Sequence, residues 1–112
     1  MEWKTAGNML YGLPEETVDK IRSVFCKYGE IEEAILYGSR AKGSAGKGSD
    51  IDLTVKGKNL NLHLLNQISL DLDDLLLPYH IDLAIYDRIE DAGLIDHIRR
   101  VGKVFYWKGE IG

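Results

Sequence analysis

Cysteine and long apolar runs are scarce in this sequence. Its 112 residues include one cysteine, Cys26, which excludes a disulfide framework and a cysteine-based metal cluster. A lone cysteine fits a reducing compartment, and we expect a cytoplasmic protein. No apolar run approaches the roughly 20 residues that a membrane-spanning helix needs. Residues 1–4 also lack the apolar centre of a signal peptide, so we expect no membrane association.

Excess positive charge is missing as well. The 14 Lys and Arg residues are outnumbered by 18 Asp and Glu residues, which gives a formal net charge of −4. Nucleic acids attract basic surfaces, so we expect no direct nucleic-acid binding. Hydrophobic residues make up 45% of the chain, enough for one globular core at this length. We therefore expect a single domain over residues 1–112, with an irregular N-terminal segment at 1–13.

Apolar spacing predicts helices that alternate with strands. Pro14 and Glu15 are typical of a helix start, and Gly29 follows the last residue at helical spacing. Helices are expected at 14–28, 60–77 and 91–102, strands at 31–37, 50–55 and 80–86, and a short extended end at 104–107. A short helix is also expected at 39–45, with Ser39 as its N-cap. This order gives an α/β (α+β) fold, a small mixed β-sheet flanked by helices.

Two acids stand at the start of the second predicted strand. Asp50 and Asp52 leave the same face, ~6.6–6.8 Å apart along the backbone. Paired carboxylates repel unless a cation lies between them, and oxygen ligands without cysteine or clustered histidine favour Mg²⁺ or Mn²⁺ over Zn²⁺. Asp82 has the same apolar neighbours in the third strand. The helix at 60–77 can serve as a crossover, so these two strands can run parallel and the three acids can converge.

A loop rich in glycine, serine and cations precedes the acids. The short link between the first two strands returns Gly38 and Ser39 to the acidic edge. Gly38 allows close backbone approach, and Ser39 begins a helix whose free N–H groups favour an anion. Arg40, Lys42 and Lys47 can offset phosphate charge. Phosphate on one side and carboxylate-held metal on the other is the arrangement for phosphoryl or nucleotidyl transfer.

Each feature has an ordinary explanation when it is taken alone. Asp-x-Asp is then a solvated strand end, and Gly-Ser is a turn with a cap. Because these features are expected at the same edge of the sheet, a functional site is the favoured interpretation. His80 shares a strand face with Asp82, which leaves a site role open, although a structural role is commoner. Structural explanations suffice for the helix acids Asp71, Asp73 and Asp74, for surface or packing residues His63 and His97, for Cys26, for the acids at 87–91, and for Tyr37 and Tyr86.

Gly38-Ser39, followed after ten residues by Asp-Ile-Asp, resembles the signature of the DNA polymerase β-like nucleotidyltransferase superfamily, and within it the minimal nucleotidyltransferases. The resemblance spans about residues 15–107. It implies the fold of that superfamily, with two Mg²⁺ ions held by Asp50 and Asp52. It also implies that Asp82 ligates one metal and helps activate the attacking hydroxyl. The nucleotide-binding residues would be Gly38, Ser39, Arg40, Lys42 and Ser49.

The resemblance also implies a reaction and a partner. ATP would be the donor, the acceptor would attack the α-phosphate in line, and pyrophosphate would leave. Larger members add a second domain that grips the acceptor, and this chain has no room for one, so another protein or subunit is expected to supply it. Minimal members resemble antitoxins whose partner is a helical HEPN-type ribonuclease toxin that receives AMP on a tyrosine. We therefore expect a homo-oligomer or a hetero-complex.

Other functions remain open at this stage. The protein could be a non-catalytic, nucleotide-sensing module that neutralises its partner by occlusion, through exposed apolar groups such as Trp3, Tyr11 or Trp107. Transfer to a small molecule such as an aminoglycoside ranks lower, because the acceptor domain is missing. A Mg²⁺-dependent nuclease ranks lower still, because the chain lacks a basic track for a polyanion.

Overall fold

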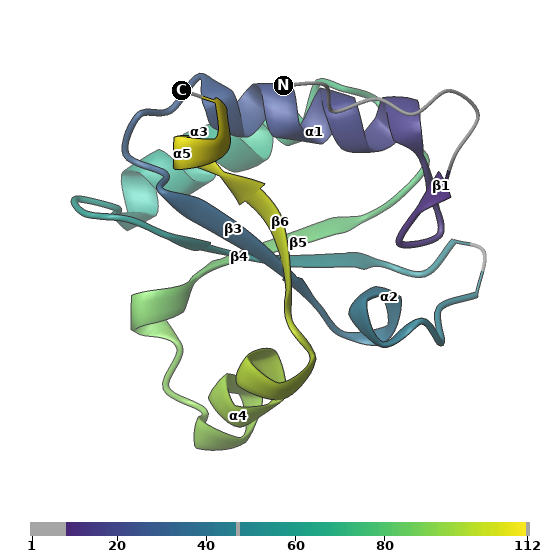
Figure 1. The fold of residues 1–112 in the computed structure, drawn as a ribbon. Helices are drawn as coiled ribbons and strands as arrows, with labels where there is room; N and C mark the ends of the chain where they lie inside the picture. The colour runs from purple at the N-terminus through teal and green to yellow at the C-terminus, as the bar shows by residue number, and fades with distance from the viewer. Residues whose placement is uncertain (1–8, 47, 112) are drawn as a thin grey trace.

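A four-stranded mixed sheet forms the centre of the computed structural model, which describes residues 9–46 and 48–111 (Figure 1). The strand order is β5-β4-β3-β6, where β4 runs parallel to β5 and β3 runs antiparallel to both β4 and β6. The strands are β3 (Glu33–Tyr37), β4 (Ile51–Lys56), β5 (Ile81–Ile85) and β6 (Lys103–Trp107). The expected mixed sheet with flanking helices is confirmed.

Helices cover both faces of this sheet. Figure 1 shows α1 (Glu15–Cys26) and α3 (Leu62–Asp73) side by side over one face, with α4 (Ala92–Val101) against the other. The short α2 (Ser39–Lys42) follows the end of β3. The apolar side of α1 packs on the sheet because its buried residues recur at helical spacing: Val18, Ile21, Val24 and Phe25. No helix in the described ranges is long and apolar enough to cross a membrane.

The central strand β4 alternates as predicted. Ile51, Leu53 and Val55 are fully buried in the core. Between them, Asp52 and Thr54 point to the opposite face, where the Thr54 hydroxyl donates a 3.0 Å hydrogen bond to the Ala84 carbonyl. The core therefore fixes β4 tightly while it leaves the acidic face of the strand turned toward the α4 side.

Helix ends differ from the sequence prediction in several places. The predicted N-cap Ser39 is wrong, because Gly38 takes that position and Ser39 is the first residue of α2. The helix expected at 60–77 is shorter, since Asn61 caps α3 and accepts a hydrogen bond from the Leu64 amide. The expected glycine cap at Gly29 is also wrong, because α1 ends at Cys26 with an ordinary helical Lys27 after it.

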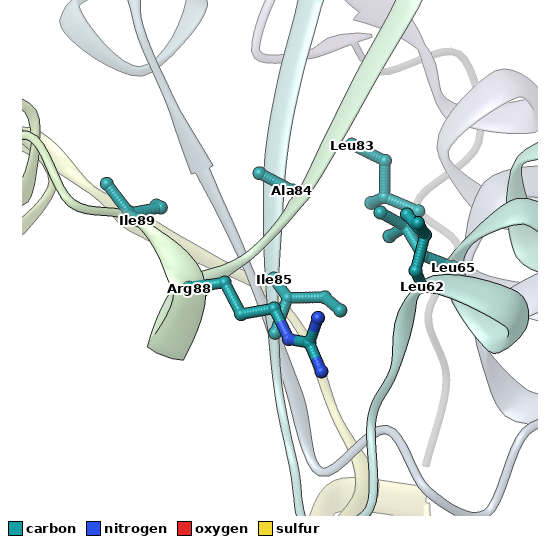
Figure 2. Close-up of a pocket in the computed structure, with 7 residues that line it drawn as sticks. All are labelled: Leu62, Leu65, Leu83, Ala84, Ile85, Arg88 and Ile89. Carbon is teal, nitrogen blue, oxygen red and sulfur yellow. The ribbon is translucent and has the colours of Figure 1, made fainter.

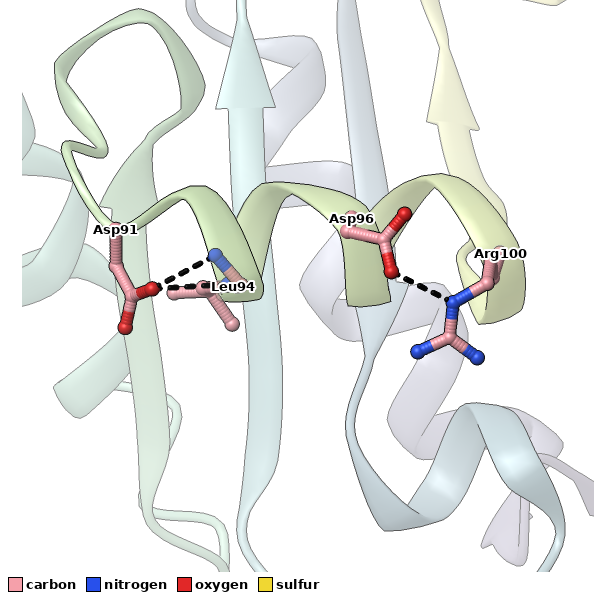
Figure 3. Close-up of polar contacts among 5 residues, drawn as sticks. Asp91, Leu94, Asp96 and Arg100 are labelled. Carbon is pink, nitrogen blue, oxygen red and sulfur yellow. Dashed lines mark hydrogen bonds and ion pairs between the residues drawn. The ribbon is translucent and has the colours of Figure 1, made fainter.

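The C-terminal half agrees more closely with the prediction. Asp91 caps α4, as expected, and its carboxylate accepts from the amides of Gly93 at 2.8 Å and Leu94 at 3.3 Å (Figure 3). Further along the helix, Arg100 pairs with Asp96 on the exposed side. A 3₁₀ turn, η1 (Tyr86–Arg88), and a short α5 (Lys108–Ile111) were not predicted.

The N-terminal segment also differs from the expectation. Residues 1–8 lie outside the described part of the chain. Residues 9–13 were expected to be irregular, but β1 (Met9–Leu10) and β2 (Leu13–Pro14) pair as a hairpin. Tyr11 and Gly12 both have positive φ angles, 57° and 75°, which is typical of a tight two-residue hairpin turn.

Candidate active site

Two carboxylates lie side by side where β4 and β5 begin. Asp52 and Asp82 are direct partners in the register of these parallel strands, and such strands lie about 4.7–4.9 Å apart. The predicted convergence of these two acids is therefore confirmed. Asp50 precedes β4, is exposed, and lies close enough for its charge to act on Asp52. Parallel pairing through the α3 crossover creates this edge, because it places the first residues of both strands together.

The acids disturb one another electrostatically. Burial raises the pKa of Asp52 above its ordinary value, and the negative charges of Asp82 and Asp50 raise it further. His80 and His97 partly offset this effect. The ionised form of Asp52 is therefore disfavoured in the folded protein, and a cation at this edge would relieve the repulsion.

A divalent metal fits the chemistry of this edge. Carboxylate oxygens are the donors that Mg²⁺ and Mn²⁺ prefer, and a cation would offset both the burial and the neighbouring negative charges that raise the pKa of Asp52. Within residues 9–46 and 48–111, no three His, Cys, Asp or Glu side chains already form a metal-binding group. The metal-ligand roles of Asp50, Asp52 and Asp82 therefore stay predictions.

Gly38 brings the backbone against Asp52. Tyr37 pairs with Asp52 across the antiparallel β3 and β4, so the next residue, Gly38, passes directly over the carboxylate. Its φ of 77° and ψ of −157° belong to a region that only glycine adopts readily. A Cβ at position 38 would overlap the Asp52 Oδ2 oxygen and lie 3.3 Å from Asp52 Cγ. Glycine is therefore favoured here by the backbone conformation, and it allows the Asp52 carboxylate to lie against the turn.

His97 joins the site from α4. Its Nε2 accepts a 3.1 Å hydrogen bond from the Gly38 amide, and its ring meets Tyr37 edge-on with centroids 6.3 Å apart. The contact with Tyr37 agrees with the interpretation of His97 as a packing residue, but its hydrogen bond to the Gly38 amide was not predicted. One signal was available, because His97 lies one turn after Leu94 and one turn before Val101, on the apolar side of the predicted helix.

Tyr37 lies between these groups. Burial raises the pKa of Tyr37 to about 12, and the charges of Asp82 and Asp52 add to this effect. The hydroxyl therefore stays protonated at neutral pH. Tyr37 is buried, as core or rim packing predicts. Tyr86 lies at the far end of β5, where Lys56 Nζ stands 4.4 Å from the centre of its ring.

The loop residues predicted to bind nucleotide occupy different environments. Ser39 is half-buried at the start of α2, Lys42 is exposed, and Lys47 lies outside the described residues. Ser49 accepts a 3.0 Å hydrogen bond at its hydroxyl from the Gly46 amide, which closes the turn before β4. Arg40 is almost fully buried and donates to backbone carbonyls, which its sequence position did not suggest. Contact of these side chains with a nucleotide stays a prediction.

A separate apolar pocket lies at the other end of β5. It has a volume of about 270 Å³ and is lined by residues of α3, β5 and η1, with Arg88 as its charged side chain (Figure 2). Ile85 is the last residue of β5 and Arg88 is the last residue of η1, whereas Asp82 lies at the start of β5. This pocket is therefore distinct from the acidic edge.

Solved structures of other proteins share the fold of this chain. A toxin–antitoxin crystal structure with AMP-PNP has a TM-score of 0.67 at 20% identity, over 84% of this chain and 76% of that chain. An MntA–HepT toxin–antitoxin structure has a TM-score of 0.64 at 17% identity, over 88% and 76%. A tri-AMPylated Shewanella oneidensis HEPN toxin in complex with an MNT antitoxin has a TM-score of 0.63 at 17% identity, over 87% and 75%. At such identities these likenesses show the fold.

The family is shown by a sequence model. No curated protein sequence matches the chain. A family model described as polymerase beta, nucleotidyltransferase, matches residues 19–111, which is most of the chain and includes the Gly-Ser turn and all three acids. The chain therefore belongs to the polymerase beta nucleotidyltransferase family.

Proposed function

We propose that this protein is a Mg²⁺-dependent nucleotidyltransferase that moves AMP from ATP onto a tyrosine hydroxyl of a partner protein. The observation that carries the proposal is the pairing of Asp52 with Asp82 at the strand edge where Gly38 lies against Asp52. This edge combines acidic metal donors with a close backbone approach. Family membership supports the reaction class, and the AMP-PNP in one similar structure supports an adenine nucleotide as donor.

Each residue at the edge has a role in this proposal. Asp50, Asp52 and Asp82 hold Mg²⁺, which supplies charge neutralisation for the triphosphate and a lower pKa for the acceptor hydroxyl. Gly38 and Ser39 receive the terminal phosphates, as the family resemblance implies, at the turn where the glycine backbone lies against the Asp52 carboxylate. The acceptor oxygen bonds to the α-phosphorus while the α–β bridging bond breaks, so pyrophosphate leaves. Asp82 accepts the hydroxyl proton.

The partner in this proposal is a HEPN-type toxin. One similar structure holds a tri-AMPylated HEPN toxin with its MNT antitoxin, which supports the same pairing for this chain. The protein would then act as the antitoxin of a two-protein system. It would neutralise the partner by modifying it.

The test uses ATP labelled at the α- or the γ-phosphate, with Mg²⁺ and the purified HEPN-type partner. Label from α-labelled ATP should stay on the partner with wild-type protein and be absent with Asp52→Asn. The matched control is Asp87→Asn, which removes the same charge from an exposed site after β5, remote from the acids. Label from γ-labelled ATP alone would mean phosphoryl transfer, and equal labelling by Asp52→Asn would contradict the assignment.

Exposed apolar groups on β6 favour a second candidate, neutralisation by binding alone. Val104 and Trp107 are 54% and 53% exposed on this edge strand, a surface that a partner could cover. Of the other two residues predicted for this role, Trp3 lies outside the described residues, and Tyr11 is half-buried against Phe105. Cells that express the toxin discriminate between the candidates. Full protection by an Asp50→Asn, Asp52→Asn double variant would favour binding over catalysis.

A further inference from the structure

Arg40 is a charged side chain with an unusual environment. It directly follows Gly38-Ser39, yet it is only 4% exposed. Its Nε and Nη2 donate to the Ser49 carbonyl at 3.1 and 2.8 Å, and its Nη1 donates to the Tyr11 carbonyl at 3.1 Å. Its guanidinium also lies over the Tyr79 ring, 5.2 Å from the centroid. Each of the three guanidinium nitrogens therefore donates a hydrogen bond to a neighbouring segment of the protein.

These contacts join the segments that form the acidic edge. Ser49 immediately precedes Asp50, and Tyr79 lies three residues before Asp82. Arg40 itself is two residues after Gly38 and reaches back to the β1–β2 turn through Tyr11. One planar, multiply hydrogen-bonding group thus spans the Gly-Ser turn, the loop before β4 and the segment before β5.

The same geometry opposes direct phosphate binding by Arg40. Three of the five guanidinium N–H groups already bond to the carbonyls of Ser49 and Tyr11, and the side chain is only 4% exposed, so a phosphate could reach it only if these contacts opened. Releasing them would leave buried carbonyls without donors and would free the loop before β4. Lys42 lies on the same short helix but, in contrast, its side chain is exposed to solvent.

We propose that Arg40 is a positioning residue that holds Ser49, the residue before Asp50, together with the segment before β5, so that the three acids face one substrate. The kinetic consequences of this inference rest on the proposed function. The claim that Arg40 holds these segments in place does not depend on it. This positioning role replaces the sequence-based prediction that Arg40 binds the nucleotide directly.

Kinetics separate positioning from ligand binding. Arg40→Lys and Arg40→Gln should both lower kcat by about 100-fold, because a displacement near 1 Å at a reacting centre has an effect of that order. KM for ATP should change by less than about threefold. Lysine should not rescue, because one ammonium cannot span the carbonyls of Ser49 and Tyr11. The matched control is Lys42→Gln, which removes an exposed cation from the same helix and should raise KM with kcat retained.

Hydrogen exchange tests the structural part without any substrate. In both Arg40 variants, the amides of residues 48–51 should exchange at least tenfold faster, while those of Leu53 and Val55 in the core of β4 stay protected. If Arg40→Gln fails to fold, Tyr79→Leu is a milder variant, because it removes only the ring beneath the guanidinium. It should increase the exchange rate of the same amides. Unchanged exchange in Arg40→Lys would overturn the proposal.

The two proposals fail in different ways. Near-normal kcat in Arg40→Lys, with a large rise in KM for ATP in Arg40→Gln, would assign Arg40 to nucleotide binding and overturn the positioning role. If wild-type protein transferred no AMP, the proposed function would fail. The exchange experiment would still decide whether Arg40 holds the loop.

Discussion

Gly38→Ala isolates the close approach between the Gly-Ser turn and the acids. The backbone at position 38 has φ 77° and ψ −157°, a region that other residues avoid. The new Cβ would overlap the Asp52 Oδ2 oxygen, while Asp52 Cγ and Cβ would lie at 3.3 and 3.5 Å. The overlapping atom is the free end of a side chain. The protein can therefore fold around the methyl group by turning the carboxylate away.

The effects on stability and activity should then differ in size. Backbone strain of this kind costs about 1–3 kcal/mol. For a domain of just over a hundred residues, this lowers Tm by about 4–12 °C. Activity should fall by about 100-fold or more, because the Asp52 carboxylate is displaced by about an ångström from its place beside Asp82.

Gly43→Ala is the matched control. Gly43 also has a positive φ, 81°, but a Cβ there would meet no atom within 4 Å. It should lose about 1–2 kcal/mol of stability from the left-handed conformation and keep its activity. The assay is AMP transfer from α-labelled ATP well below both melting temperatures, with Tm followed by circular dichroism. Equal activity in both variants would refute the reasoning, since the approach of Gly38 to Asp52 would then be irrelevant.

Three further predictions follow from single contacts. Asp52→Asn should raise the free energy of unfolding above pH 3.8 and leave it unchanged below, because the folded-state pKa of Asp52 is raised and its charge is disfavoured; urea titrations measure this. His97→Gln should keep an acceptor for the Gly38 amide, whereas His97→Leu should lower kcat/KM roughly 2- to 10-fold. Tyr28→Phe should destabilise the link between α1 and α3 most at neutral pH. The difference from wild type should shrink below pH 3.8, where Asp71 protonates, and between pH 10 and about 12, where Tyr28 ionises.

The acidic edge could be predicted because its signals are local. Strict alternation in β4 placed Asp52 opposite the core, and a helix between two strands predicted their parallel pairing. Asp52 and Asp82 each have apolar neighbours on both sides in the sequence. This match indicated that the two acids occupy equivalent positions along neighbouring strands. The register confirms this, since the two acids are direct partners.

The partners of the Gly-Ser turn could not be predicted in the same way. Arg40 and His97 depend on contacts between segments that are distant in sequence: Arg40 reaches Tyr11 across 29 residues, and Gly38 reaches His97 across 59. An arginine in a glycine-rich loop reads as solvated, because nothing nearby shows what would bury it. The β1–β2 hairpin was missed for a related reason, since strands of two residues show no alternation.

The charge balance of the edge favours metal ions over side chains as the main counter-charge for a nucleotide. Arg40 donates to the carbonyls of Ser49 and Tyr11, and Lys42 is exposed on α2. Meanwhile burial, and then the charges of Asp82 and Asp50, raise the pKa of Asp52 and disfavour its ionised form. A triphosphate alone would add repulsion to this edge, whereas a triphosphate with Mg²⁺ would remove it. Under the proposed function, this edge would accept nucleotide and metal together, and the repulsion among its acids would favour the metal-bound form of the nucleotide.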